Sequence, residues 1–188
     1  NKFYSSIKNF EKLNFEIIWR PFQLNPDMPL EGMNRKDYLK TKFGSEEKAQ
    51  EIYKKIYQVG VDNKIYFQFD KINKTPNSFA SHKLLALAFL EKKQETVLQT
   101  LFYSYFIEGN NIGDLNELIK IAKQHNIYDK NTLNYLSSDE DKENLLGEQI
   151  QAQNLGIKSV PCFIVDKKIV LFGAQDKKVF YDLFKTMT

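Results

Sequence analysis

The hydrophobic pattern of the first third of the chain predicts a helix, a short strand and a second helix. Apolar residues recur at spacings of three and four over residues 1–13, which predicts a helix. Residues 15–19 are aromatic and β-branched, which predicts a strand, and Pro21 ends it because proline has no N–H for a ladder. Ser45 can cap a helix over 46–59. This part is therefore a mixture of helix and strand.

The middle of the chain has helical spacing throughout. Between residues 76 and 155 the apolar side chains fall into three stripes with period 3.6, which is typical of helices that pack one face into a core. The stripes are Leu84, Leu85, Ala88 and Phe89; Val97, Leu98, Leu101, Phe102, Tyr105 and Phe106; and Leu115, Leu118, Ile119 and Ala122. Gly156 ends the last of these helices, because glycine readily adopts the left-handed conformation that closes a helix.

The period changes again after Gly156. Two apolar runs, 160–165 and 169–172, are separated by a short charged turn and predict a hairpin, and a final amphipathic helix follows. A hairpin alone is marginally stable in water. We therefore expect the two β-containing ends of the chain to share one sheet, in an α/β fold that carries the helical block as an insertion.

Composition narrows the function classes. The chain has 188 residues with 27 basic and 24 acidic side chains, a net charge of +3. Only Arg20 and Arg35 are arginines, the residue on which bidentate recognition of phosphates and bases depends, so we expect no nucleic-acid partner. One cysteine, Cys162, and two histidines, His82 and His125, cannot complete a zinc site, so we expect no metal. No run of 18 apolar residues is present, so we expect no membrane span.

The segment 156–165 is the most informative for function. Pro161 stands directly before an apolar strand that turns back as a hairpin. If the Val160–Pro161 bond is cis, the backbone of Val160 turns outward and offers its N–H and C=O to a ligand. A trans proline at the first residue of a strand is the common alternative. The residues alone leave both conformations open.

This segment carries a resemblance to a known family. Gly-Ile-x-x-Val-Pro-x-Phe-Ile-Val at 156–165, followed by Phe-Gly-Ala-Gln-Asp at 172–176, resembles the DsbA-like thioredoxin family, and within it the FrnE-type dithiol–disulfide isomerases. The resemblance continues in Trp-Arg-Pro-Phe-x-Leu-x-Pro at 19–26, Pro-Asn-Ser at 76–78 followed by His82, and Tyr-Phe-x-Glu-Gly at 105–109. It therefore covers nearly the whole chain.

The resemblance implies a thioredoxin-like fold of the DsbA type with a large, all-helical inserted domain. Residues 1–70 would form the first part of the thioredoxin-like domain, 71–155 the helical insertion, and 156–188 the C-terminal β-β-α part. It also implies a cis bond at Val160–Pro161 and a cytoplasmic location. The activity it implies is thiol–disulfide exchange with a disulfide-containing protein or a small-molecule thiol.

The chain departs from the family at the catalytic motif. The family carries Cys-x-x-Cys at its first strand–helix junction, just before the helix expected at 1–13, and neither cysteine is in this sequence. Such a pair works because a helix N-terminus stabilises the thiolate, which attacks the substrate disulfide. We therefore expect the pair, and the central strand before it, in roughly 10–20 residues upstream of Asn1, since a strand takes about 5–6 residues.

The six candidate substrate-binding residues, His82 among them, lie in the segments that carry the resemblance. Val160 and Pro161 would pair their backbone with the substrate chain, and Arg20 can meet a ligand carboxylate or tie its own loop to the body. An alternative function is glutathione-dependent isomerisation or transfer of the hydroxychromene-carboxylate type. There Gln175 and Asp176 would bind the glutamyl end of glutathione, the candidate cofactor of that reaction. A second alternative is a catalytically silent binding module of the same fold.

Two further side chains have competing interpretations. His82 can act as an acid/base group beside the thiol site, or it can hydrogen-bond the preceding loop and help to pack the insertion. Cys162 can serve as a substitute nucleophile, but a strand cysteine with no helix N-terminus or base beside it is more typical of a buried and inert thiol.

Overall fold

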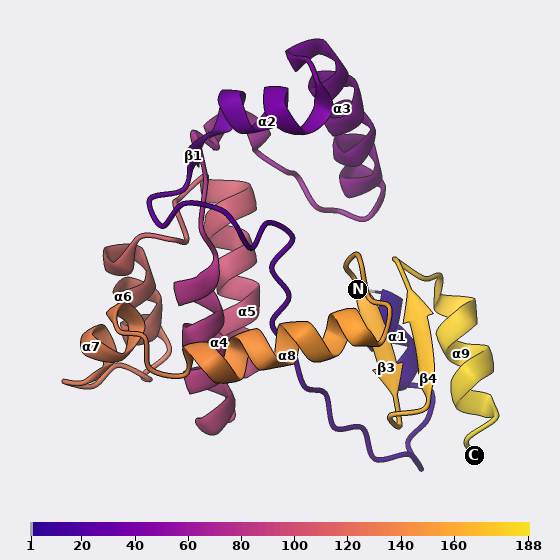
Figure 1. The fold of residues 1–188 in the computed structure, drawn as a ribbon. Helices are drawn as coiled ribbons and strands as arrows, with labels where there is room; N and C mark the ends of the chain where they lie inside the picture. Colours follow the sequence, from indigo (N-terminus) through magenta and orange to yellow (C-terminus); the bar gives the residue numbers. More distant parts are fainter. Residues whose placement is uncertain (1) are drawn as a thin grey trace. The chain divides into compact units, whose positions relative to one another are not determined.

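The chain forms two compact units, and one of them is built from two segments that are far apart in the sequence. The computed structural model describes residues 2–188 (Figure 1). Unit 1 combines the described residues up to Leu24 with Leu146–Thr188, and unit 2 is Asn25–Leu145. Unit 2 is therefore an insertion between two segments that fold together.

Unit 1 is a hairpin covered on one face by two helices. Its elements are α1 (Lys2–Ile7), β3 (Cys162–Val165), β4 (Ile169–Phe172), α9 (Lys177–Lys185) and the second half of α8 (Lys142–Asn154). β3 and β4 are antiparallel, with Cys162 opposite Phe172 and Val165 opposite Ile169. The core is aromatic: the ring of Phe3 lies 5.2 Å from that of Phe180 and 5.7 Å from that of Phe163. Large rings at these separations contribute both buried area and favourable edge contacts.

Unit 2 is mostly helical. Its elements are β1 (Met33–Asn34), α2 (Arg35–Phe43), α3 (Glu46–Asp62), the 3₁₀ turn η1 (Phe69–Lys71), β2 (Lys74–Thr75), α4 (Phe79–Leu90), α5 (Gln94–Tyr103), the π-helical turn η2 (Ser104–Glu108), α6 (Leu115–Gln124), α7 (Thr132–Ser137) and the start of α8. Ser45 caps α3, as predicted. No helix among the described residues is both long and apolar enough to cross a bilayer.

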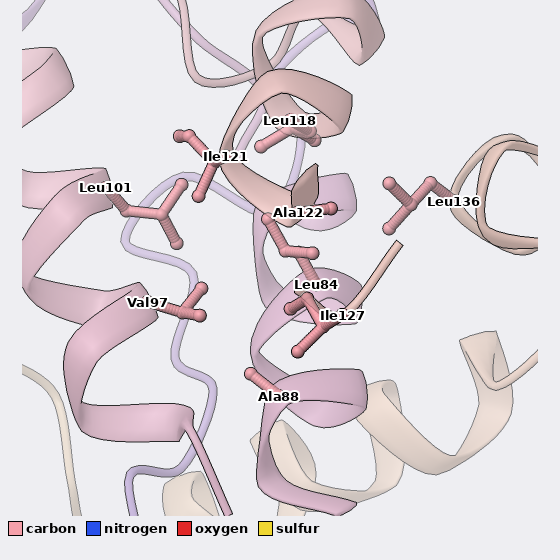
Figure 2. Close-up of a cluster of buried hydrophobic side chains, with 9 residues drawn as sticks. All are labelled: Leu84, Ala88, Val97, Leu101, Leu118, Ile121, Ala122, Ile127 and Leu136. Carbon is pink, nitrogen blue, oxygen red and sulfur yellow. The ribbon is translucent and has the colours of Figure 1, made fainter. Parts of the chain in front are cut away.

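The core of unit 2 lies among α4, α5, α6 and α7 (Figure 2). The predicted stripes supply most of it, because each helix points one apolar face inward. The buried side chains of this cluster are Leu84, Ala88, Val97, Leu101, Leu118, Ile121, Ala122, Ile127 and Leu136. The prediction that this region is a packed helical core is therefore confirmed.

A buried arginine joins the first half of unit 2. Arg35 follows β1, which pairs with β2 in a two-residue antiparallel ladder. Its guanidinium donates hydrogen bonds to the hydroxyls of Thr75 (3.0 Å) and Tyr53 (2.5 Å) and lies over the Tyr53 ring. One side chain thus links β2 to α3 through planar, charge-assisted hydrogen bonds.

A buried lysine donates hydrogen bonds to the carbonyl groups at the C-terminal end of α7. The Lys83 side chain comes from α4 and is fully buried. Its ammonium donates hydrogen bonds to the backbone carbonyls of Tyr135 and Ser138 and lies over the Tyr135 ring. The last carbonyls of a helix have no partner within the helix, so Lys83 satisfies groups that would otherwise be buried without a hydrogen bond.

The structure corrects two expectations about the strands. The strand expected at 15–19 is not formed, and the two β-containing ends do not share a sheet. The described strands form two separate two-stranded ladders. Aromatic and β-branched residues form a strand only where a neighbouring strand supplies ladder hydrogen bonds, and residues 15–19 have no such neighbour among the described strands. Helices dominate the fold, and the two compact units divide at 24/25 and 145/146. The hydrogen bonds of Arg35 to Tyr53 and Thr75 join α2 and α3 to β2 within unit 2.

The first helix is also shorter than predicted. α1 ends at Ile7, and the chain continues in tight turns in which Phe10 N–H donates to the Ile7 carbonyl and Leu13 N–H to the Phe10 carbonyl. These i→i−3 bonds keep Phe10 in the core without a continuing α-helix.

Lys83 gives a test of this packing. Replacing Lys83 with Met keeps the volume but leaves the Ser138 carbonyl without its donor, which we expect to lower the free energy of unfolding by about 2 kcal/mol. Urea unfolding of both proteins measures the difference. The matched control is Lys120→Met at an exposed lysine of α6, expected to stay within about 0.5 kcal/mol. Equal effects of the two substitutions would contradict the role of Lys83.

Candidate functional site at one end of unit 1

Three segments that are far apart in the sequence meet at one end of unit 1. The Val160–Pro161 bond is cis, which confirms the prediction. The Gly173 N–H donates to the Pro161 carbonyl at 2.8 Å, and the Lys2 ammonium donates to the Asp176 carboxylate at 2.7 Å. Figure 1 shows the starts of α1, β3 and α9 at this end and the β3–β4 turn at the other. We call this end the proline end.

The local sequence explains how the Val160–Pro161 turn is presented. α8 ends at Asn154, and Gly156 adopts a left-handed φ of 78°, which turns the chain away from the helix axis. The Ile157 N–H then donates to the Ala152 carbonyl and fixes the exit of the chain. Val160 is 48% exposed, so the turn lies at the surface of the unit.

Gln175 and Asp176 already have partners within the protein. The Gln175 carboxamide donates to the Phe172 carbonyl at 2.6 Å. Asp176 stands at the N-cap of α9 but bonds Lys2 instead of the helix, and the hydrogen bond from Lys2 lowers the pKa of its carboxyl. Both bonds therefore hold the start of α9 in place and engage one polar atom of each side chain.

Arg20 ties its segment to α8. Its guanidinium lies 2.9 Å from one carboxylate oxygen of Glu148, and the other oxygen of Glu148 is buried without a hydrogen-bond partner. The neighbouring Gln149 carboxamide exchanges two hydrogen bonds with the Gln23 backbone, accepting from its N–H at 2.7 Å and donating to its carbonyl at 3.1 Å. Of the two interpretations of Arg20, the structure shows the tie within the protein.

His82 belongs to α4 of unit 2, whereas the other five predicted site residues belong to unit 1. Its ring is half-buried, and burial lowers the pKa of His82 to about 4. The imidazole is therefore neutral near pH 7 and can donate from one nitrogen and accept at the other.

Cys162 is a free thiol at the first residue of β3. Burial raises its pKa above the ordinary value, so the reactive thiolate is scarce near neutral pH. No group of three or more His, Cys, Asp or Glu side chains among residues 2–188 is arranged to hold a metal ion. Cys162, the one thiol among residues 2–188, is therefore not activated as a nucleophile.

Sequence reasoning missed the contacts that hold this end together. Lys2 and Asp176 are 174 positions apart, and neither lies in a pattern that pairs them. Glu148 and Gln149 are ordinary helix residues with no local signal. The one readable signal was Gly173, whose left-handed φ of 78° lets the chain turn into α9 beside Pro161.

The pKa of His82 predicts how stability depends on pH. Because burial lowers the pKa from 6.5 to about 4, the unfolded chain binds the proton more tightly than the folded protein between these values. Stability is therefore full above pH 6.5 and falls as the pH drops toward 4, and because the ring is half-buried the loss stays below the roughly 3 kcal/mol that the full pKa shift corresponds to. Urea unfolding from pH 4 to 7.5 should show a shallower acid decline in His82→Gln. Parallel curves for the two proteins would contradict this origin.

The raised pKa of Cys162 predicts slow alkylation. Because only the thiolate reacts, the thiol should react with iodoacetamide near pH 7 more slowly than cysteine in a short peptide. Its alkylation rate should also keep increasing with pH beyond the pH at which the rate of the peptide levels off. Mass spectrometry of quenched samples measures both rates. A rate equal to the peptide's in the folded protein would show that Cys162 is activated.

Comparison with known proteins agrees with this fold. The family model for a DSBA-like thioredoxin domain matches residues 3–185. A probable DsbA oxidoreductase from Streptomyces coelicolor has a similar crystal structure, with a TM-score of 0.87 at 20% sequence identity, over 98% of this chain and 81% of that one. No curated protein matches. Because the family model spans almost all of its residues, the chain belongs to the DSBA-like thioredoxin domain family.

Proposed function

We propose that this protein is a thiol–disulfide oxidoreductase or isomerase of the FrnE type, with its Cys-x-x-Cys pair upstream of Asn1. The observation that carries the proposal is the proline end of unit 1, where Lys2 joins the start of α1 to the start of α9 and the Gly173 N–H holds the carbonyl of the cis Pro161. A cysteine pair directly before α1 would lie beside this turn. Membership of the DSBA-like family supports the same chemistry.

The free edge of β3 supports an upstream strand. β3 pairs with β4 alone among the described strands, so its other edge has ladder groups to offer. Residues 15–18 alternate between half-buried and exposed, as a strand does, without forming one. A strand inserted beside β3 would satisfy these groups and carry the cysteine pair to the proline end.

The proposed reaction is thiol–disulfide exchange. The first upstream thiolate attacks one sulfur of the substrate disulfide, forms a mixed disulfide and releases the other substrate sulfur as a thiolate. The second upstream thiolate then attacks the mixed disulfide, which leaves the substrate as a dithiol and the protein oxidised; the reverse sequence oxidises a substrate. Val160 and Pro161 would hold the substrate backbone, and Arg20 would keep its segment fixed.

The alternatives have less support. In the glutathione-dependent reaction Gln175 and Asp176 would bind the glutamyl group, yet they bond Phe172 and Lys2. The single, unactivated cysteine of this sequence also fits the silent binding module, and the activity of the protein with its upstream segment distinguishes that module from the enzyme. Disulfide-containing polypeptides or small thiols therefore remain the proposed substrates.

Activity measurements test the proposal. Insulin reduction and refolding of scrambled ribonuclease should be at background for a polypeptide of residues 1–188, because its one thiol is not activated. The protein with its upstream cysteine pair should be active, and changing both upstream cysteines to Ser should abolish the activity. Cys162→Ser is the matched control and should keep it. Equal activity of residues 1–188 alone, lost in Cys162→Ser, would overturn the proposal.

A further inference from the structure

We propose that the proline end selects polypeptide substrates whose disulfide is flanked by acidic residues. This rests on the proposed function, because the ligand is the polypeptide that undergoes exchange. Four lysines stand at this end in the described residues, and the one carboxylate among them, Asp176, is already paired. The lysines are Lys2, Lys158, Lys177 and Lys178.

Two of these lysines are free to meet a ligand. Lys2 is held by Asp176, and Lys178 lies 2.5 Å from the Asp182 carboxylate one turn along α9. Lys158 and Lys177 are exposed and form no ion pair within residues 2–188. Lys158 is two residues before Val160, and Lys177 follows Asp176 directly. Their charges therefore flank the turn that would hold the substrate backbone.

The charge is uneven between the two units. Unit 1 has 10 basic and 6 acidic side chains, a net charge of +4, whereas unit 2 has 17 basic and 18 acidic, a net charge of −1. Charges at the rim of a binding surface mainly increase the association rate and discriminate between partners. Lys158 and Lys177, which form the basic rim of the proline end, would accelerate association with acidic polypeptide segments and disfavour association with lysine-rich segments.

The composition favours a polypeptide over a nucleic acid as the anionic ligand. Unit 1 contains a single arginine, Arg20, and its guanidinium is engaged by Glu148. Nucleic-acid readout depends on bidentate arginine contacts, which lysines do not provide. Lysines act as point charges and suit flexible carboxylates on either side of a disulfide.

The hairpin provides a matched control. Lys167 and Lys168 lie in the β3–β4 turn, at the opposite end of the four-residue strand. At about 3.4 Å per residue this turn is roughly 13 Å from Pro161, farther than the screening length of about 8 Å at physiological salt. Reversing two charges there changes the net charge of unit 1 as much as reversing two at the proline end, without altering the rim.

The experiment measures binding without redox chemistry. Two fluorescent peptides carry serine where a substrate has cysteine and differ only in flanking glutamates or lysines, and anisotropy gives their affinities at low and physiological salt. We expect the glutamate peptide to bind more tightly, with the preference reduced by salt. The Lys158→Glu/Lys177→Glu protein should lose about fivefold to tenfold in affinity for it. The Lys167→Glu/Lys168→Glu protein should lose less than twofold.

Each contrary outcome overturns the inference. Equal affinity for the two peptides, no binding of either, or equal losses in the two double variants would show that the rim does not select acidic segments. Tighter binding of a single-stranded oligonucleotide than of the glutamate peptide, lost in Lys158→Glu/Lys177→Glu, would assign the rim to another ligand. Failure of the proposed redox function is distinguishable, because the peptides carry no thiol: the preference would persist while insulin reduction by the protein with its upstream segment is absent.

Discussion

The hydrogen bond from the Gly173 N–H to the Pro161 carbonyl decides where the candidate site lies. It extends the β3–β4 pairing by one step beyond Cys162 and Phe172, so the chain that enters β3 and the chain that leaves β4 stay together. The start of α9 follows within four residues, and its Asp176 draws in Lys2 and the start of α1. The position of the proline end thus depends on the short β3–β4 ladder and on the aromatic core that packs α1 and α9 against this ladder.

The two buried cations of unit 2 show a shared solution to an energetic problem. A buried charge is costly unless hydrogen bonds compensate it. Arg35 is satisfied by hydroxyl groups and Lys83 by backbone carbonyls, and both also lie over a tyrosine ring. Neutral acceptors avoid the second desolvation cost that a buried carboxylate would add. Each cation joins segments that the apolar stripes alone would leave free to shift.

How well the sequence predicted a feature depends on how far apart in the sequence the interacting residues lie. The core of unit 2 was predictable because helical stripes are local, and the hairpin and final helix were predictable because their periods change at Gly156 and Gly173. The strand at 15–19 was wrongly predicted, since its pattern is that of a strand but a ladder depends on a neighbour. The site residues of unit 1 came from motif resemblance, whereas the bonds of Lys2 to Asp176 and of Arg20 to Glu148 join distant positions that no local pattern pairs.

The discontinuity of unit 1 has a consequence for biosynthesis. Unit 2 is one continuous segment and can fold as soon as it leaves the ribosome. Unit 1 cannot, because Lys2 must wait for Asp176, 174 positions later, which takes on the order of 10–30 s at the usual rates of translation. During that interval the apolar side chains of α1, such as Phe3 and Ile7, have none of their α9 partners. A nascent chain of this protein therefore exposes α1 to chaperones, and to modification, until the residues of α9 have been synthesised.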